Sequence, residues 1–226
     1  MSPTSTRRAH ALALAATLVG WSFTAGPQRP RRRHPLVQAA LGTALALTAG
    51  APLGLRPPQL RSGLRLGGAA AGVVAATVAA STALPRVRSA MSERELPDRV
   101  GRWLALEIPL GTVWSEETAF RGALAVASSV AFGTAGGRLV QAIAFGLSHI
   151  PDARATGESV VGTVALTGLA GWLFGWLAQR SGSLAAPMLA HLAINEAGAL
   201  AALVTQRRSG GGTLASAADR HQTANR

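Results

Sequence analysis

The sequence predicts an all-α fold, an integral membrane helical bundle of about six to eight transmembrane helices around a polar cavity. Hydrophobic residues make up 48% of the 226 positions and charged residues only 14%, whereas an ordinary soluble domain carries roughly 25% charged residues. The mean hydropathy is +0.26. The apolar residues also fall in stretches close to the roughly 20 residues that a helix needs to cross the hydrocarbon core. Together these observations exclude a disordered polar chain and most soluble enzymes of this size.

The charge of the chain is strongly positive, with 22 basic against 10 acidic residues and a net charge of +12. Every basic residue is an arginine, and the arginines form short clusters between apolar stretches, such as those in ranges 29–33 and 86–102. Such clusters are typical of loops that flank membrane spans, so membrane lipids with anionic headgroups are the expected partner. Nucleic-acid binding is disfavoured because aromatic residues, at 4% of the chain, offer almost no stacking platform. The chain has no cysteine, which excludes thiol catalysis and thiolate metal sites.

Several stretches are long and apolar enough to be membrane helices. The predicted spans are 10–26, 35–55, 66–84, 115–133, 136–150, 159–178 and 183–205. The first follows Arg7 and Arg8 and is either a secretory signal or an uncleaved first helix; the further spans favour the helix. Residues 103–114 would make the helix after them too long for one crossing, so Pro109 and Gly111 predict a break there. We expect residues 103–114 to approach the membrane as an interfacial or re-entrant segment.

Three regions follow from this pattern. Residues 1–100 are expected to hold N-terminal transmembrane helices with arginine-rich loops, and residues 101–206 the functional core. Residues 207–226, which are glycine-rich and then polar, are expected to form a disordered tail.

Polar side chains gather in the apolar second half of the chain. An ionisable group inside a span costs several kcal/mol unless it meets a partner or a cavity, so each such residue is a candidate for function. Three pairs lie four residues apart, and each pair therefore shares one helix face. The pairs are Glu117 with Arg121, Phe145 with His149, and His191 with Asn195.

Each of these residues also has a structural explanation. Glu116 and Glu117 follow Ser115 and could serve only to complement a helix dipole at its N-terminus. His149 could sit at a helix C-terminus, and Asn195 could hydrogen-bond between membrane helices. His191 is the hardest to explain in this way, because it lies deep in apolar surroundings and needs a polar partner.

Carboxylate, imidazole and amide groups in one site suit the activation of water. A carboxylate in a low-dielectric site is a competent general base near neutral pH, and an imidazole can position the same water. A further histidine and asparagine offer donors for the oxyanion of a tetrahedral intermediate. One glutamate and two histidines also match the ligand set of catalytic zinc. The residues alone leave both alternatives open.

Three motifs give these residues a family resemblance. Glu116-Glu117-Thr-Ala-Phe-Arg121 resembles the EExxxR motif of the CPBP family, the CAAX-protease and bacteriocin-processing (Abi) membrane endopeptidases. Phe145-Gly-Leu-Ser-His149 is similar to the FxxxH motif of that family, and His191-Leu-Ala-Ile-Asn195 to its HxxxN motif. The three occur in the family's order, and the resemblance runs from about residue 107 to residue 203.

The resemblance implies a role for each motif residue. Glu116 would be the general base and His149 would help to hold the attacking water. His191 and Asn195 would form the oxyanion site. Glu117 and Arg121 would orient and support the base, and Phe145 would be a supporting residue. The resemblance leaves open a metallopeptidase, with zinc held by Glu116, His149 and His191, and a metal-free reaction.

The function expected from the resemblance is an intramembrane endopeptidase of class EC 3.4 in the bacterial plasma membrane. Its partner would be a membrane-associated peptide or protein, either lipidated and CAAX-like or bacteriocin-like. The alternative is a non-catalytic immunity or scaffold protein that binds a partner in the bilayer. A small transporter with a proton relay is a third hypothesis, disfavoured because the chain shows no paired repeats.

Overall fold

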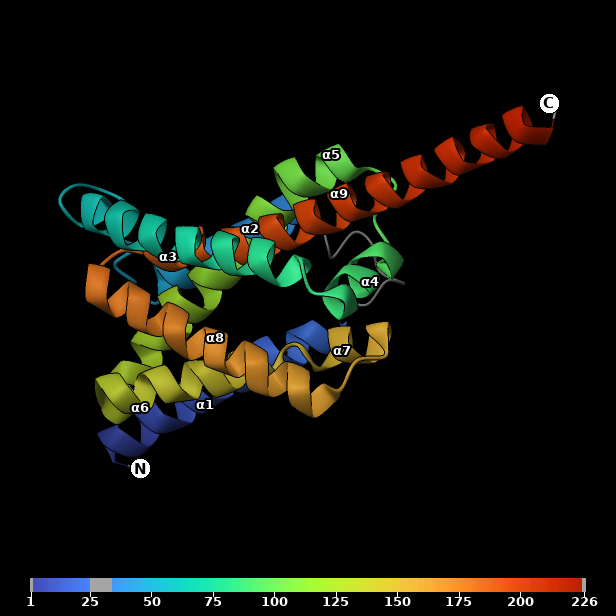
Figure 1. The fold of residues 1–226 in the computed structure, drawn as a ribbon. Coiled ribbons are helices and arrows are strands. Elements are labelled where there is room, and N and C mark those ends of the chain that lie inside the picture. The colour runs from blue at the N-terminus through green and yellow to red at the C-terminus, as the bar shows by residue number, and fades with distance from the viewer. Residues whose placement is uncertain (1, 25–33, 225–226) are drawn as a thin grey trace.

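The computed structural model describes residues 2–24 and 34–224, with side chains described as far as Arg208. Within these ranges all regular structure is helical (Figure 1), which confirms the all-α prediction. The helices are α1 (Pro3–Thr24), α2 (Pro35–Thr48), α3 (Gln59–Thr82), α4 (Pro85–Glu93), α5 (Val100–Arg102), the π-helices η1 (Trp103–Trp114) and η2 (Glu117–Leu124), α6 (Ala125–Leu147), α7 (Ile150–Thr156), α8 (Val160–Ser181) and α9 (Ala185–Ala224).

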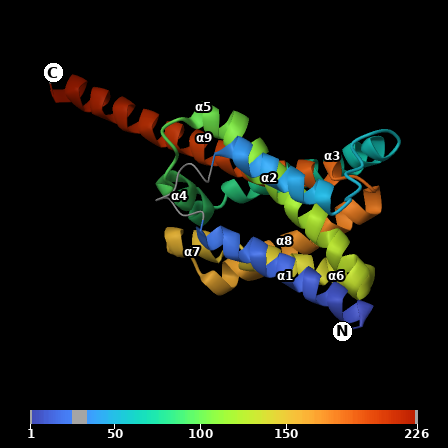
Figure 2. The ribbon, with the colours of Figure 1, turned by 180° about the vertical axis from the view of Figure 1, so that it is seen from behind.

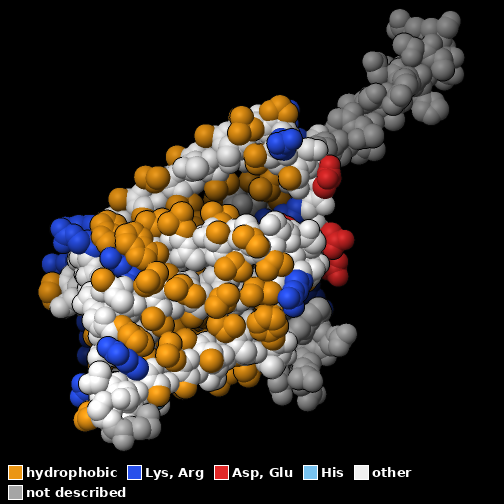
Figure 3. All heavy atoms as spheres, turned by 90° about the horizontal axis from the view of Figure 1, so that it is seen from below, with side chains coloured by type: hydrophobic (Ala, Val, Ile, Leu, Met, Phe, Trp, Pro, Cys, Tyr) orange, Lys and Arg blue, Asp and Glu red, His pale blue; other side chains and the backbone are white. Residues whose placement is uncertain are grey.

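The helices form a membrane bundle, as predicted. Four helical stretches of the described chain are long and apolar enough to cross a membrane, namely Gln59–Thr82, Val100–Thr156, Val160–Ser181 and Ala185–Arg208. The 57 residues of the second stretch would measure about 86 Å as one straight helix, far more than a bilayer core of about 30 Å. Hydrophobic side chains cover much of the visible surface (Figure 3), and α8 exposes Val161 by 80% and Leu166 by 70%. These side chains face the region that lipid would occupy.

The long second stretch turns at Gly133. Its φ of 75° and ψ of 170° belong to a conformation that is essentially restricted to glycine. Beyond the turn Gly137 packs against the chain before it, where an added Cβ would lie only 2.5 Å from the backbone nitrogen of Ser129. The second part of α6 therefore runs back against η2, at the point where the sequence predicts one span to end and the next to begin.

The break expected at Pro109 and Gly111 is wrong. Pro109 lies inside η1, and the helical path continues through Trp114 into η2. In an α-helix a proline ring meets the carbonyl four residues before it. The wider turn of a π-helix, in which hydrogen bonds span five residues, relaxes this contact.

Helices α3 and α9 touch through small residues. A Cβ added at Gly63 would lie 2.7 Å from the Cβ of Ser183. A Cβ added at Gly67 would lie 2.7 Å from the Cα of Ala186. Small residues allow membrane helices to approach this closely. Backbone of α9 is helical as far as Ala224, while its side chains are described to Arg208. The region boundary at residue 100 and the disordered tail from residue 207 therefore stay predictions.

The two N-terminal helices belong to the same body as the rest. In Figure 2 α1 runs alongside α6, and its Leu18 packs in a core cluster with Phe120 and Phe145. Helix α2 packs on η1 and η2, where the Trp114 indole N–H donates to Thr43 Oγ1 over 2.9 Å. The first stretch of the chain thus contributes to the core as a helix.

Candidate active site

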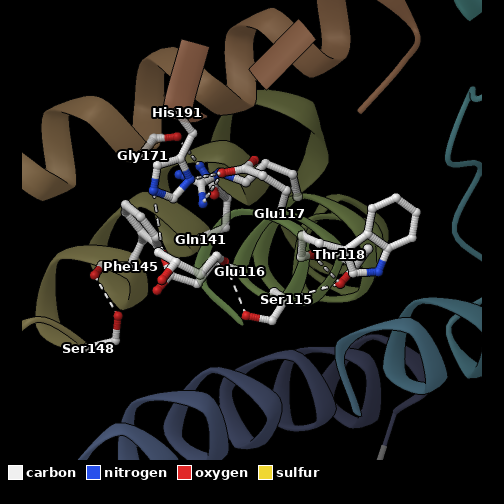
Figure 4. Close-up of polar contacts among 12 residues, drawn as sticks. Ser115, Glu116, Glu117, Thr118, Gln141, Phe145, Ser148, Gly171 and His191 are labelled. Carbon is white, nitrogen blue, oxygen red and sulfur yellow. Dashed lines mark hydrogen bonds and ion pairs between the residues drawn. The ribbon is translucent and has the colours of Figure 1, made fainter. Parts of the chain in front are cut away.

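A buried group of three charged or ionisable side chains lies where η2 meets α9. Glu117 is fully buried, and its Oε1 atom lies 2.8 Å from His191 Nδ1 and 3.3 Å from Arg121 Nη1. Glu117 and Arg121 share a face of η2, as their spacing predicts, and His191 comes from α9 (Figure 4). His191 therefore has the polar partner that its surroundings require.

Aromatic rings enclose this buried group. The Arg121 guanidinium lies 3.9 Å from the ring centre of Phe145 and 5.0 Å from that of Phe174. The imidazole of His191 stacks on Phe174 with ring centres 5.0 Å apart and planes at 26°. Aromatic faces stabilise a guanidinium while they keep water away. Phe145 thus packs its ring against the Arg121 guanidinium.

The partners of His191 determine which of its nitrogens carries the proton. The Glu117 carboxylate oxygen is the acceptor in this contact, so His191 Nδ1–H donates to it. In the neutral ring Nε2 then carries a lone pair. This atom lies 3.8 Å from Oε2 of Glu116. Glu116 Oε2 and His191 Nε2 therefore face each other at a distance too long for a direct hydrogen bond.

A cavity of about 740 Å³ brings the other predicted residues together. Glu116, His149 and Asn195 all line it, and they come from three separate segments of the chain. The side chain of Glu116 is 28% exposed, in contrast to the fully buried Glu117. Helices α1 and α2 supply much of the opposite wall, with Leu18 and Leu45 among the lining residues.

The opposite environments of Glu116 and Glu117 follow from helix geometry. Successive side chains on a helix point to different sides of its axis. Glu117 is directed toward Arg121 and His191 in the core, whereas Glu116 lines the cavity.

The imidazole of His149 is hydrogen-bonded to the C-terminal turn of α6. Its Nδ1 lies 2.8 Å from the Phe145 carbonyl oxygen, which can only accept, so Nδ1–H donates there. Ser148 Oγ donates to the same carbonyl over 2.8 Å. The neutral ring therefore presents Nε2 as an acceptor, and a water molecule in the cavity is a suitable donor to it.

Asn195 retains donor capacity at the cavity. Its Nδ2 donates to the carbonyl oxygen of His191, one helical turn earlier, over 3.1 Å. An amide nitrogen has two N–H groups, so one of them is left for a group bound in the cavity.

The predicted zinc ligands do not fit a metal ion in this arrangement. Glu116 Oε2 and His191 Nε2 lie 3.8 Å apart, and His149, whose Nδ1 is bonded to its own helix, has only Nε2 to offer. In the part of the chain that the structure describes, no group of three or more histidine or acidic side chains is arranged to hold a metal.

Two residues with clear roles at or beside the site were not predicted as site residues. Phe174 stacks on His191, yet it lies between Trp172 and Trp176 in a uniformly apolar helix, so no sequence signal distinguishes it. Gln141 is fully buried, and its amide nitrogen donates to the carbonyl oxygens of Arg138 and Gly171, which joins α6 to α8. A lone amide in an apolar stretch was the available signal, and it indicates structure rather than chemistry.

Comparison with known proteins places this site in a family. Residues 99–197 match the family described as Type II CAAX prenyl endopeptidase Rce1-like. This segment belongs to the CPBP family. The match contains all three motifs and begins immediately before α5, so it covers the elements that carry Glu116, His149, His191 and Asn195. No curated protein and no solved structure matches the chain. The matched segment, which is 99 of the 226 residues, is thus similar to that of CAAX-type prenyl endopeptidases.

Proposed function

We propose that this protein hydrolyses a peptide bond of a membrane-associated substrate, lipidated and CAAX-like or bacteriocin-like, with water activated by Glu116. The observation that supports the proposal is the cavity of about 740 Å³ that Glu116, His149 and Asn195 share. It provides a carboxylate base, an imidazole acceptor and an amide donor around one space. Its opposite wall is formed by apolar helices, which suits a substrate that arrives from the membrane.

The first step is the attack of water on the scissile carbonyl carbon. His149 Nε2 accepts a hydrogen bond from the water and orients it, while the Glu116 carboxylate removes one of its protons. The O–H bond breaks as the new C–O bond forms. His191 Nε2, 3.8 Å from Glu116 Oε2, is placed to take that proton from the carboxylate.

The second step is stabilisation and collapse of the tetrahedral intermediate. Protonated His191 becomes a donor at Nε2, and with the remaining N–H of Asn195 it can stabilise the oxyanion. The charge of the imidazolium is balanced by Glu117, which accepts from Nδ1 at 2.8 Å. When the C–N bond breaks, the leaving amine takes up the proton that the water gave.

This sequence of steps uses only side chains of the chain, because the predicted zinc ligands do not form a metal-binding group. We expect a metal chelator to leave the rate of peptide cleavage unchanged in purified protein. A rate that is lost with the chelator and restored by one equivalent of zinc would contradict this part of the proposal alone.

The test of the proposal is cleavage of a panel of lipidated and unlipidated peptides by purified protein in lipid nanodiscs. Glu116→Gln keeps the shape of the side chain but removes the base, so it should reduce kcat by about 10²-fold to 10⁴-fold. Glu107→Gln is the matched control, because Glu107 is a half-exposed carboxylate paired with Arg102 on the surface. It should cleave at the rate of the unchanged protein.

Cleavage that survives Glu116→Gln would contradict the assignment of the base. If the unchanged protein binds such peptides but releases no products, the non-catalytic immunity or scaffold role would replace the proposal.

A further inference from the structure

A second cavity lies between α3 and α9, away from the candidate active site. The two helices touch at Gly63 and Gly67. Further along, they border a cavity of about 860 Å³ that shares no lining residue with the first. We call this space the α3–α9 groove. Much of its lining is small and apolar, with Ala75, Ala79, Ala197 and Ala201 among the lining residues.

Two arginines line the same groove. Arg88 of α4 and Arg208 of α9 are both exposed, and both belong to its lining. Among the side chains that the structure describes, neither is paired with a carboxylate. Two like charges on one groove repel each other unless an anion lies between them.

The combination of an apolar floor and two cations indicates the chemistry of the ligand. We propose that the α3–α9 groove binds an anionic phospholipid, with its phosphate at Arg88 and Arg208 and an acyl chain between α3 and α9. An arginine pairs well with a phosphate because its planar fork matches the phosphate oxygens. A free anion would leave the apolar floor unused, and a zwitterionic lipid would bring a cation toward the two arginines.

Charge complementarity decides the occupant. A second copy of this chain carries a net charge of +12. Its docking in the groove would therefore place a positively charged protein next to Arg88 and Arg208. An anionic lipid instead neutralises them, and each arginine close to an anionic lipid surface contributes about 1 kcal/mol.

The experiment measures phospholipid binding by native mass spectrometry of delipidated protein in detergent, titrated with phosphatidylglycerol. We expect the first phosphatidylglycerol molecule to bind each protein with higher affinity than the molecules that bind after it. Arg88→Gln combined with Arg208→Gln should weaken this binding by about tenfold or more. The matched control is Arg61→Gln with Arg65→Gln, two exposed arginines of α3 outside the groove, which removes the same charge and should leave the affinity unchanged.

A second variant tests the apolar part with all arginines in place. Ala201→Leu fills the groove and should displace the acyl chain, so binding falls although the charge is unchanged. Size-exclusion chromatography checks that each variant stays folded, and a variant that fails is replaced by Ala79→Leu on the facing helix.

Three results would overturn the proposal. They are equal phosphatidylglycerol binding by the arginine double variant, equal binding of phosphatidylcholine by the unchanged protein, and displacement of the lipid by inorganic phosphate alone. A dimer that forms in detergent without lipid and is lost in Ala201→Leu would assign the groove to a second copy instead.

Discussion

Neighbouring carboxylates in this site have different surroundings because the helix sends them in different directions. Glu117 is fully buried between Arg121 and His191, whereas Glu116 reaches the cavity. A buried carboxylate next to an arginine is held in place and cannot reach a substrate. The partly exposed one borders the cavity. The sequence motif names both residues, but only their surroundings distinguish the supporting role from the proposed base.

The buried pair gives the first prediction. Glu117→Gln leaves the Arg121 guanidinium buried without a counter-charge, so stability should fall by about 3–5 kcal/mol. In contrast, Glu107→Gln removes a half-exposed partner of Arg102 and should cost less than about 1 kcal/mol. Thermal unfolding in detergent, followed by tryptophan fluorescence, measures both. The combined Glu117→Gln and Arg121→Gln variant should lose less stability than the sum of the two single changes; a simple sum would show that the two groups are not coupled.

The second prediction concerns the two nitrogens of His149. Asparagine can place an N–H near the position of Nδ1, so His149→Asn should keep the bond to the Phe145 carbonyl and lose the acceptor at Nε2. If the proposed function holds, kcat for peptide cleavage should fall by about 10²-fold or more with little change in melting temperature. His149→Gln places its amide near Nε2 and should retain more activity with lower stability. The reverse order of the two kcat values would contradict the assigned orientation of the ring.

At the scale of the elements, the turn at Gly133 brings the second part of α6 back against the helix that carries Glu116 and Glu117. Its φ of 75° and ψ of 170° strain any other residue. Gly133→Ala should therefore lower stability by about 1–3 kcal/mol, seen as a lower melting temperature. Gly72→Ala is the control, because no atom lies within 4 Å of its added Cβ and the position is helical. If both substitutions had the same effect, the backbone at Gly133 would not be the cause.

The contact between α3 and α9 offers a closely matched pair of neighbouring glycines. A Cβ at Gly67 would lie 2.7 Å from Ala186 Cα and 2.8 Å from its carbonyl oxygen, whereas Gly68 has open space around it. Gly67→Ala should push the helices apart and cost about 1–3 kcal/mol, while Gly68→Ala should be neutral or slightly stabilising. Comparison of the two melting temperatures checks this. Equal melting temperatures of the two variants would show that α3 and α9 are not in contact at Gly67.

Elements were predictable where periodicity or a special residue determines them, and less so elsewhere. Spacing by four residues correctly placed Glu117 with Arg121 on one face, and the boundary predicted between spans 115–133 and 136–150 coincides with the turn at Gly133. The break at Pro109 was predicted from the rule for α-helices, and a π-helix does not obey it. The pairing of His191 with Glu117 joins residues 74 positions apart, and no local pattern contains such a contact.

At the scale of the whole molecule, the site depends on a part of the chain that lies outside the matched family segment. Helices α1 and α2 precede residue 99, where the match begins, yet they line the cavity that contains Glu116. Residues 1–98 carry none of the three motifs, so this role could not be predicted from the sequence. It follows from the packing of α1 on α6 and of α2 on η1 and η2.

The dependence on α1 can be tested with two leucines of that helix. Leu18 is 9% exposed, packs on the cluster of Phe120 and Phe145, and lines the cavity, whereas Leu12 is 52% exposed. Leu18→Ala should lower stability by about 2–4 kcal/mol through the space it leaves, and it should raise KM for a lipidated peptide because the cavity wall is lost. Leu12→Ala should change neither quantity. If both variants behave like the unchanged protein, α1 is not part of the working molecule; a loss confined to Leu18→Ala would show that the catalytic body extends beyond the family segment to the first helix.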